Sequence, residues 1–185
     1  MKYKLININD ISDGEYRKWY SMMDIEKQNR VNRFRFLDDK KRTIAGDMLS
    51  RMMIADYCNV NYGNIVFCKN KYGKPFVKDL PIEFNISHSN DLVICTINNT
   101  PIGVDIEKVR PVDINVIKKV CNKDELEYAL NDNSYKHFFE IWTFKEAYFK
   151  CIGTGITDFN SINYFDNNRR KHTLVCDGYI IHIIY

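Results

Sequence analysis

The chain has 185 residues, of which 45% are hydrophobic and 14% aromatic, and this excludes a disordered tail, a collagen-like fibre and a low-complexity linker. Lys and Arg number 27 against 24 Asp and Glu, so the net charge of +3 is too small to indicate a dedicated nucleic-acid-binding or membrane-surface protein. No apolar run approaches the roughly 20 residues of a membrane helix, and the first ten residues lack the apolar core of a secretory signal. The sequence therefore predicts a cytoplasmic protein without a membrane partner.

The six cysteines are scattered singly, and no pair has the C-x-x-C spacing of a zinc or redox site. Each lies among apolar or aromatic neighbours, which indicates small core residues in a reduced protein.

The first half of the chain mixes strand and helix patterns. Weak alternation predicts a strand over Tyr3 to Ile11, and Ser12 with Glu15 forms a capping box that begins a helix. Apolar residues at three- and four-residue spacing predict a longer helix over Arg42 to Tyr57. Two further strands are predicted at 84–86 and 92–97.

The second half begins with a strictly alternating strand over Ile102 to Glu107. Helices are predicted over Lys123 to Leu130 and Tyr135 to Cys151, the second ending at Gly153. Two short strands around Asp177-Gly178 form a hairpin pattern. Because strands and helices mix without a regular βαβ order, we expect an α+β fold, with the seam between two halves near Pro101.

Charge is segregated along the sequence. Residues 26–51 hold eight basic and four acidic side chains, whereas residues 124–146 hold six acidic and two basic ones. Two solvated helix faces would explain both blocks. A functional interpretation is a basic half that holds anionic groups and an acidic half that holds a cation.

Two carboxylates lie on one face of the strand after Pro101. Asp105 and Glu107 are two residues apart, so their side chains leave the same face, and two like charges on a half-buried strand need neutralising. Mg²⁺ suits this pair because it takes one or two carboxylates and completes its coordination with water and phosphate oxygens. The alternative is that Lys108 and Arg110 pair with the carboxylates at an exposed edge.

The segment 141–150 is apolar nearly all round, which predicts a buried helix. Trp142, Glu146 and Lys150 are spaced i, i+4, i+8 and share one face. Glu146 and Lys150 could form an ordinary ion pair one turn apart. Alternatively, Glu146 is a third carboxylate facing the strand, with Lys150 beside the resulting cation site.

No glycine-rich phosphate loop is present, because Gly153-Thr154-Gly155 lacks the rest of such a pattern. If phosphate is bound, side chains must hold it, and the candidates are Lys74, His88 and the basic residues of the first half. His88 follows Ser87 at the end of a predicted strand, where a lone histidine is more often a surface residue.

Five motifs occur in order and together resemble the 4′-phosphopantetheinyl transferase family, the type that acts on the carrier proteins of peptide and polyketide synthases. The motifs are Arg42-Thr43 with Gly46-Asp47, Tyr72-Gly73-Lys74-Pro75, Phe84-Asn85-Ile86-Ser87-His88-Ser89, Gly103-Val104-Asp105-Ile106-Glu107, and Trp142 with Lys145-Glu146-Ala147 and Lys150.

The resemblance implies two similar α/β halves related by pseudo-two-fold symmetry, with coenzyme A bound between them. Residues 1–101 would form the N-terminal half with the coenzyme A-binding basic residues and the Ser-His segment. Residues 102–185 would form the C-terminal half with the carboxylates and the 141–150 helix. The second half is short compared with longer relatives, so we expect Tyr179 to Tyr185 to be exposed or paired with another chain.

The implied activity is Mg²⁺-dependent transfer of the 4′-phosphopantetheine arm of coenzyme A to a serine of an apo acyl or peptidyl carrier protein, releasing adenosine 3′,5′-bisphosphate. Carried over by motif, Glu146 is the candidate base, directly or through a metal-bound water, and Lys150 lies near the transferred phosphate. The implied Mg²⁺ ligands are Asp105, Glu107 and Glu146. The implied coenzyme A contacts are Lys27, Arg30, Arg42, Thr43, Lys74, Ser87 and His88.

Two alternatives of other classes remain. A nucleic-acid-binding module would use the basic stretch from Arg33 to Arg51 with Phe34 and Phe36 for stacking, but it leaves the three carboxylates unexplained. A metal-dependent phosphohydrolase would keep the cation site. The resemblance favours the transferase, and we expect a monomer that does not bind nucleic acid.

Overall fold

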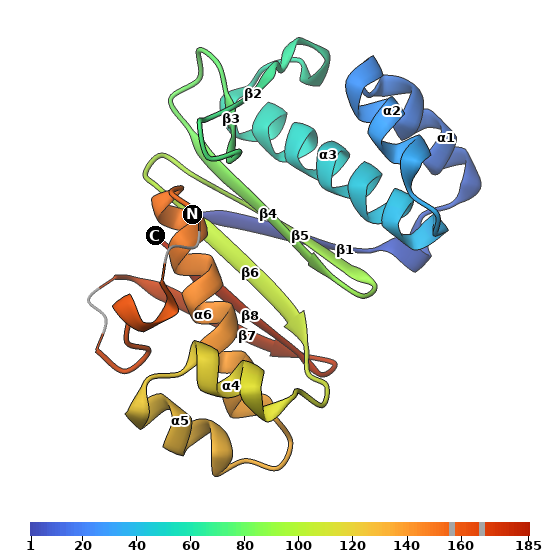
Figure 1. The fold of residues 1–185 in the computed structure, drawn as a ribbon. Helices are drawn as coiled ribbons and strands as arrows, with labels where there is room; N and C mark the ends of the chain where they lie inside the picture. The colour runs from blue at the N-terminus through green and yellow to red at the C-terminus, as the bar shows by residue number, and fades with distance from the viewer. Residues whose placement is uncertain (156–157, 167–168) are drawn as a thin grey trace.

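The computed structural model describes residues 1–155, 158–166 and 169–185 and has an α+β fold, as predicted (Figure 1). The N-terminal elements are β1 (Lys2–Asn7), α1 (Asp13–Met22), α2 (Ile25–Arg33), α3 (Leu37–Cys58), β2 (Phe67–Lys69), β3 (Pro75–Val77), β4 (Glu83–Ser89) and β5 (Leu92–Asn98). The C-terminal elements are β6 (Gly103–Lys108), α4 (Ile114–Val120), α5 (Lys123–Leu130), α6 (Lys136–Ile152), β7 (Lys171–Cys176) and β8 (Tyr179–Ile184). In the described part of the chain, no helix is both long and apolar enough to cross a membrane.

Each half is built around one antiparallel three-stranded sheet. The strand orders are β1-β5-β4 and β6-β8-β7, and β2 pairs with β3 in a separate hairpin. The expectation that Tyr179 to Tyr185 is exposed or paired with another chain is wrong. The turn at Asp177-Gly178 folds β8 back between β6 and β7, so β8 is hydrogen-bonded on both edges and all six of its residues are buried.

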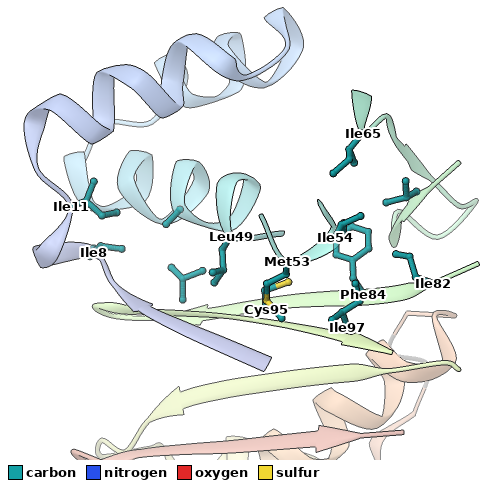
Figure 2. Packing of buried hydrophobic residues seen from close by; sticks show 13 residues of the cluster. Ile8, Ile11, Leu49, Met53, Ile54, Ile65, Ile82, Phe84, Cys95 and Ile97 are labelled. Carbon is teal, nitrogen blue, oxygen red and sulfur yellow. The ribbon is translucent and has the colours of Figure 1, made fainter. Parts of the chain in front are cut away.

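The N-terminal core lies between α3 and the first sheet. Figure 2 shows Leu49 and Met53 of α3 facing Phe84, Cys95 and Ile97 of the strands. α3 begins at Leu37, five residues before the predicted start, and its buried residues run from Ile44 to Ile54. The capping box predicted at the start of α1 is present.

The C-terminal core depends on close packing of α6 against β6. A Cβ atom on Gly103 would lie 2.0 Å from the Ala147 carbonyl oxygen and 2.3 Å from the Cys151 nitrogen, so only glycine permits this approach. Gly153 ends α6 with a φ of 76°, as the sequence predicts. The close approach brings the Glu146 and Lys150 face of α6 to the carboxylates of β6.

The two sheets also meet each other. Leu5 and Ile94 of the first sheet belong to the same apolar cluster as Val104 and Ile106 of the second. β4 and β6 also lie alongside each other, which brings Ser87 and Ser89 of β4 to Asp105 and Glu107 of β6. Among the cysteines, Cys95, Cys121 and Cys151 are buried, and Cys58, Cys68 and Cys176 are partly buried; all six are free thiols.

Candidate active site between the two halves

Asp105 is the centre of the candidate site. Its side chain lies on the face of β6 covered by α6 and is only 4% exposed. Oδ1 accepts hydrogen bonds from Ser87 Oγ at 2.8 Å and from Lys150 Nζ at 2.5 Å. Oδ2 is buried and has no hydrogen-bond partner among the described residues. Burial raises the pKa of Asp105, although the positive charge of Lys150 partly opposes this rise.

Glu107 lies two residues further along β6. Its Oε2 accepts hydrogen bonds from Ser89 Oγ at 2.8 Å and Arg110 Nη1 at 2.9 Å. The predicted pairing of a strand carboxylate with a basic residue at the exposed edge is therefore present for Arg110. Lys108 instead places its ammonium 5.1 Å from the centre of the Tyr179 ring.

Glu146 lies on α6 near both strand carboxylates. Burial, followed by the negative charge of Asp105, raises the pKa of Glu146 to about 7. Lys150, one turn further along α6, donates its short hydrogen bond to Asp105 rather than serving as a simple helix pair for Glu146. The structure thus favours the interpretation in which helix and strand carboxylates share one site.

The donor set of this site fits a hard divalent cation. Within residues 1–155, 158–166 and 169–185, no three His, Cys, Asp or Glu side chains already have the arrangement of a metal site. However, three carboxylates supply only oxygen ligands, which Mg²⁺ prefers, and the unpaired Asp105 Oδ2 offers a buried acceptor to a cation. A cation would also offset the repulsion that raises the pKa of Glu146.

The Ser-His segment brings the N-terminal half into the site. Ser87 Oγ also lies 3.2 Å from Lys150 Nζ, and this bonding joins β4, β6 and α6. His88 points to the opposite side of β4, where its exposed ring is near Arg42 of α3. Desolvation by surrounding protein atoms, followed by the charge of Arg42, lowers the pKa of His88. Arg42 itself donates to Asn90 O at 2.5 Å.

The remaining basic candidates differ in their surroundings. Thr43 Oγ1 donates to the Asp39 carbonyl within α3, and Arg30 is exposed on α2. Lys27 pairs with Asp47 and lies over the Phe67 ring. Lys27 is therefore part of a packed charge cluster in the N-terminal half.

A pocket of about 270 Å³ lies between the halves. It is lined by Tyr72, Gly73, Lys74, Pro75, Asn85, Ile86, Glu146, Phe149, Lys150, Gly153 and Gly155. Lys74 Nζ donates to the Ile102 and Cys151 carbonyls at 3.2 and 3.3 Å, so it ties the β2–β3 region to the C-terminal half.

Lys145, which precedes Glu146 in the same motif, has a different environment. It is fully buried, and its ammonium donates to Glu125 at 2.5 Å and to the Val120 and Phe159 carbonyls at 2.9 Å. These three acceptors satisfy the ammonium, so Lys145 links α4, α5 and the segment after α6.

Asn85 and Ser89 are two polar residues of the site that were not among the predicted site residues. Asn85 Oδ1 accepts the Val104 N–H at 2.9 Å, and Ser89 holds Glu107. Polar residues at alternate positions could have indicated them, because Asn85, Ser87 and Ser89 occupy every second position of β4 and share one face.

Comparison with known proteins identifies both halves. Residues 101–183 match the 4′-phosphopantetheinyl transferase superfamily, and residues 10–99 match the N-terminal region of 4′-phosphopantetheinyl transferases. The chain is 38% identical over 151 residues to the 4′-phosphopantetheinyl transferase gsp of Aneurinibacillus migulanus, covering 80% of this chain and 63% of that protein. It is 35% identical to Sfp of Bacillus subtilis (strain 168), covering 80% and 67%.

A third relative is the 4′-phosphopantetheinyl transferase HetI of Nostoc sp., which is 37% identical over 163 residues, covering 83% of this chain and 69% of that protein. The chain thus spans about two thirds of the length of these curated relatives. The chain belongs to the 4′-phosphopantetheinyl transferase family.

Proposed function

We propose that this protein transfers the 4′-phosphopantetheine arm of coenzyme A to a serine hydroxyl of an apo carrier protein, with Mg²⁺ bound, and releases adenosine 3′,5′-bisphosphate. The observation that carries the proposal is the bonding of Asp105 to Ser87 and Lys150 beside Glu146, at a pocket between the halves. The similarity to 4′-phosphopantetheinyl transferases supports the reaction class.

In the proposed reaction, the carrier serine oxygen forms a bond to the phosphorus that bears the pantetheine arm. The bond from this phosphorus to the bridging pyrophosphate oxygen breaks, and the electron pair leaves with adenosine 3′,5′-bisphosphate. Glu146 accepts the serine proton, a role suited to a carboxylate whose pKa is about 7. Lys150 stabilises negative charge on the transferred phosphate. Asp105, Glu107 and Glu146 would hold Mg²⁺, which would supply charge neutralisation for the pyrophosphate.

The basic residues of the N-terminal half have a binding role in this proposal. The proposed coenzyme A contacts are Lys27, Arg30, Arg42, Thr43, Lys74, Ser87 and His88. Phosphate is then held by side chains, in keeping with a sequence that lacks a glycine-rich phosphate loop.

The proposal also takes residues 1–101 and 102–185 as two halves related by a pseudo-two-fold axis. Equal strand order supports this relation, because in each three-stranded sheet the last strand of the half lies between the first and the second. A site at the junction would then require both halves at once.

Incubation of the protein with coenzyme A, Mg²⁺ and an apo carrier protein, followed by mass spectrometry of the carrier, tests the proposal. We expect the carrier to gain the mass of phosphopantetheine and the gain to disappear with EDTA. Breakdown of coenzyme A without a gain on the carrier would contradict transfer and favour the phosphohydrolase alternative. Absence of any reaction together with tight oligonucleotide binding would favour the nucleic-acid-binding alternative.

A further inference from the structure

A row of side chains, rather than a backbone ladder, joins β4 to β6. Three alternate residues of β4 each bond to β6 or to a side chain it carries. The three links are Asn85 Oδ1 to the Val104 N–H at 2.9 Å, Ser87 Oγ to Asp105 Oδ1 at 2.8 Å, and Ser89 Oγ to Glu107 Oε2 at 2.8 Å.

The spacing of this row matches the spacing of the carboxylates. Ser87 and Ser89 are two residues apart on one strand, and Asp105 and Glu107 are two residues apart on the other. Both steps correspond to a rise of about 6.6–6.8 Å, so the hydroxyls are in register with the carboxylates. The N-terminal half therefore contributes one hydroxyl to each strand carboxylate.

Ser89 is the more buried of the two groups that hold Glu107. It is 8% exposed, and its oxygen both donates to Glu107 and accepts the Lys108 N–H at 3.1 Å, so the direction of its hydroxyl is fixed. Arg110, by contrast, has a side chain that is 54% exposed. Both hydrogen bonds that the described residues make to this carboxylate use Oε2, which leaves Oε1 for a cation.

We propose that Ser89 is a positioning residue that orients Glu107 for the divalent cation. This inference rests on the proposed function, because it assigns Glu107 to a metal site. Removing the hydroxyl leaves Oε2 held only by an exposed arginine, so Glu107 samples orientations that do not ligate. Groups that orient a metal ligand typically contribute tenfold or more to metal affinity.

The test is titration of the purified protein with Mn²⁺ in the presence of coenzyme A, followed by electron paramagnetic resonance of free Mn²⁺. Ser89→Ala is expected to weaken Mn²⁺ binding about tenfold, while Ser89→Thr, which keeps a hydroxyl, retains most of the affinity. The transfer rate of Ser89→Ala should recover at high Mg²⁺, because the ligand itself is intact.

Ser50→Ala is the matched control. Ser50 is 1% exposed and donates to the Asp47 carbonyl at 2.8 Å inside α3. The Ser50→Ala substitution therefore also removes a hydrogen bond made by a buried hydroxyl. We expect a comparable loss of thermal stability with unchanged Mn²⁺ affinity. If Ser89→Ala does not fold, Ser89→Cys fills the same space with a weaker donor and is expected to give a smaller loss of affinity.

The outcomes separate the two proposals. Wild-type Mn²⁺ affinity in a folded Ser89→Ala or Ser89→Cys variant overturns the positioning role while leaving the metal site intact. Equal weakening by Ser89→Ala and Ser50→Ala also overturns it, because the effect would then follow stability alone. No Mn²⁺ binding by the wild-type protein overturns the metal site and the positioning role together.

Discussion

Each half of the molecule buries an aspartate, and the two aspartates are bonded differently. Asp47 on α3 is 7% exposed and has both oxygens paired, one with Lys27 and the other with Arg51 Nε at 2.9 Å. Asp105 on β6 is 4% exposed but keeps Oδ2 without a partner among the described residues. A fully paired buried carboxylate contributes to the fold, whereas an incompletely paired one retains the capacity to bind a ligand.

The basic block at residues 26–51 and the acidic block at residues 124–146 also contain charges that are paired within the fold. In the basic block, Lys27 and Arg51 are bound to Asp47, and in the acidic block Glu125 is bound to Lys145. These pairs lie within one half. The contacts that cross from β4 to Asp105 and Glu107 are instead made by the hydroxyls of Ser87 and Ser89.

The largest expected effect contrasts the two aspartates directly. Asp105→Asn and Glu146→Gln are expected to lower kcat by roughly 10²–10³-fold or more, because each removes charge at the site of reaction, while coenzyme A still binds. Asp47→Asn is expected to keep kcat and to lower the free energy of unfolding by about 3 kcal/mol. Carrier mass spectrometry and thermal melts measure both quantities. Near-normal turnover in either site variant would contradict the assignment.

The second prediction contrasts two glycines that lie between helix and sheet. Gly103→Ala is expected to destabilise the protein by about 3 kcal/mol or more, because its Cβ would overlap the α6 backbone. Gly46→Ala is expected to be neutral or stabilising, since its Cβ would meet Ile86 at 3.4 Å and alanine is the better helix former. Denaturant unfolding measures the difference. Equal effects would show that α6 can move away from β6 freely.

The third prediction assigns acid sensitivity to the C-terminal half. His182 is fully buried opposite Asp105 in the β6–β8 register, with Nδ1 2.8 Å from Thr143 Oγ1, and burial lowers its pKa to about 3. The unfolded chain therefore binds a proton that the folded chain excludes. Below pH 6.5 this residue should reduce stability by about 1.4 kcal/mol per pH unit, and the loss should continue down to about pH 3.

His182→Leu is expected to remove this part of the pH dependence, as measured by denaturant unfolding between pH 6.5 and 4. His88→Ala is the control in the N-terminal half, and its exposed ring predicts a smaller change in slope. An unchanged slope in His182→Leu would assign the acid sensitivity to other groups.

The smallest expected effects distinguish binding from packing within the basic half. Arg30→Ala should raise KM for coenzyme A a few-fold without changing kcat or Tm, because Arg30 is exposed and its proposed contact stabilises substrate and transition state equally. Lys27→Ala should raise KM and also lower Tm, since Asp47 loses one of its two partners. Steady-state kinetics and thermal melts together test these assignments. An unchanged KM in Lys27→Ala would leave Lys27 with a structural role alone.

Several elements were predictable because their signals are local. The capping box at Ser12, the helix from Lys123 to Leu130 and the C-cap at Gly153 each depend on residues within one or two turns. The helices α2 and α4 were not predicted. α2 contains only two apolar residues, of which Val31 is buried, and α4 is only seven residues long, so neither offers a long apolar pattern from which a helix could be predicted.

The sequence by itself determined which carboxylates share a face of β6, which residues share a face of α6, and the family, because strand and helix periodicity and ordered motifs are properties of the chain. Only the tertiary structure decided that β8 lies in the centre of its sheet, that Lys150 bonds to Asp105, and that Ser89 holds Glu107. These contacts join residues far apart in the chain and depend on a close approach of α6 to β6 and of β4 to β6. The spacing of residues along the chain does not predict these distances, because they arise only when the two halves pack together.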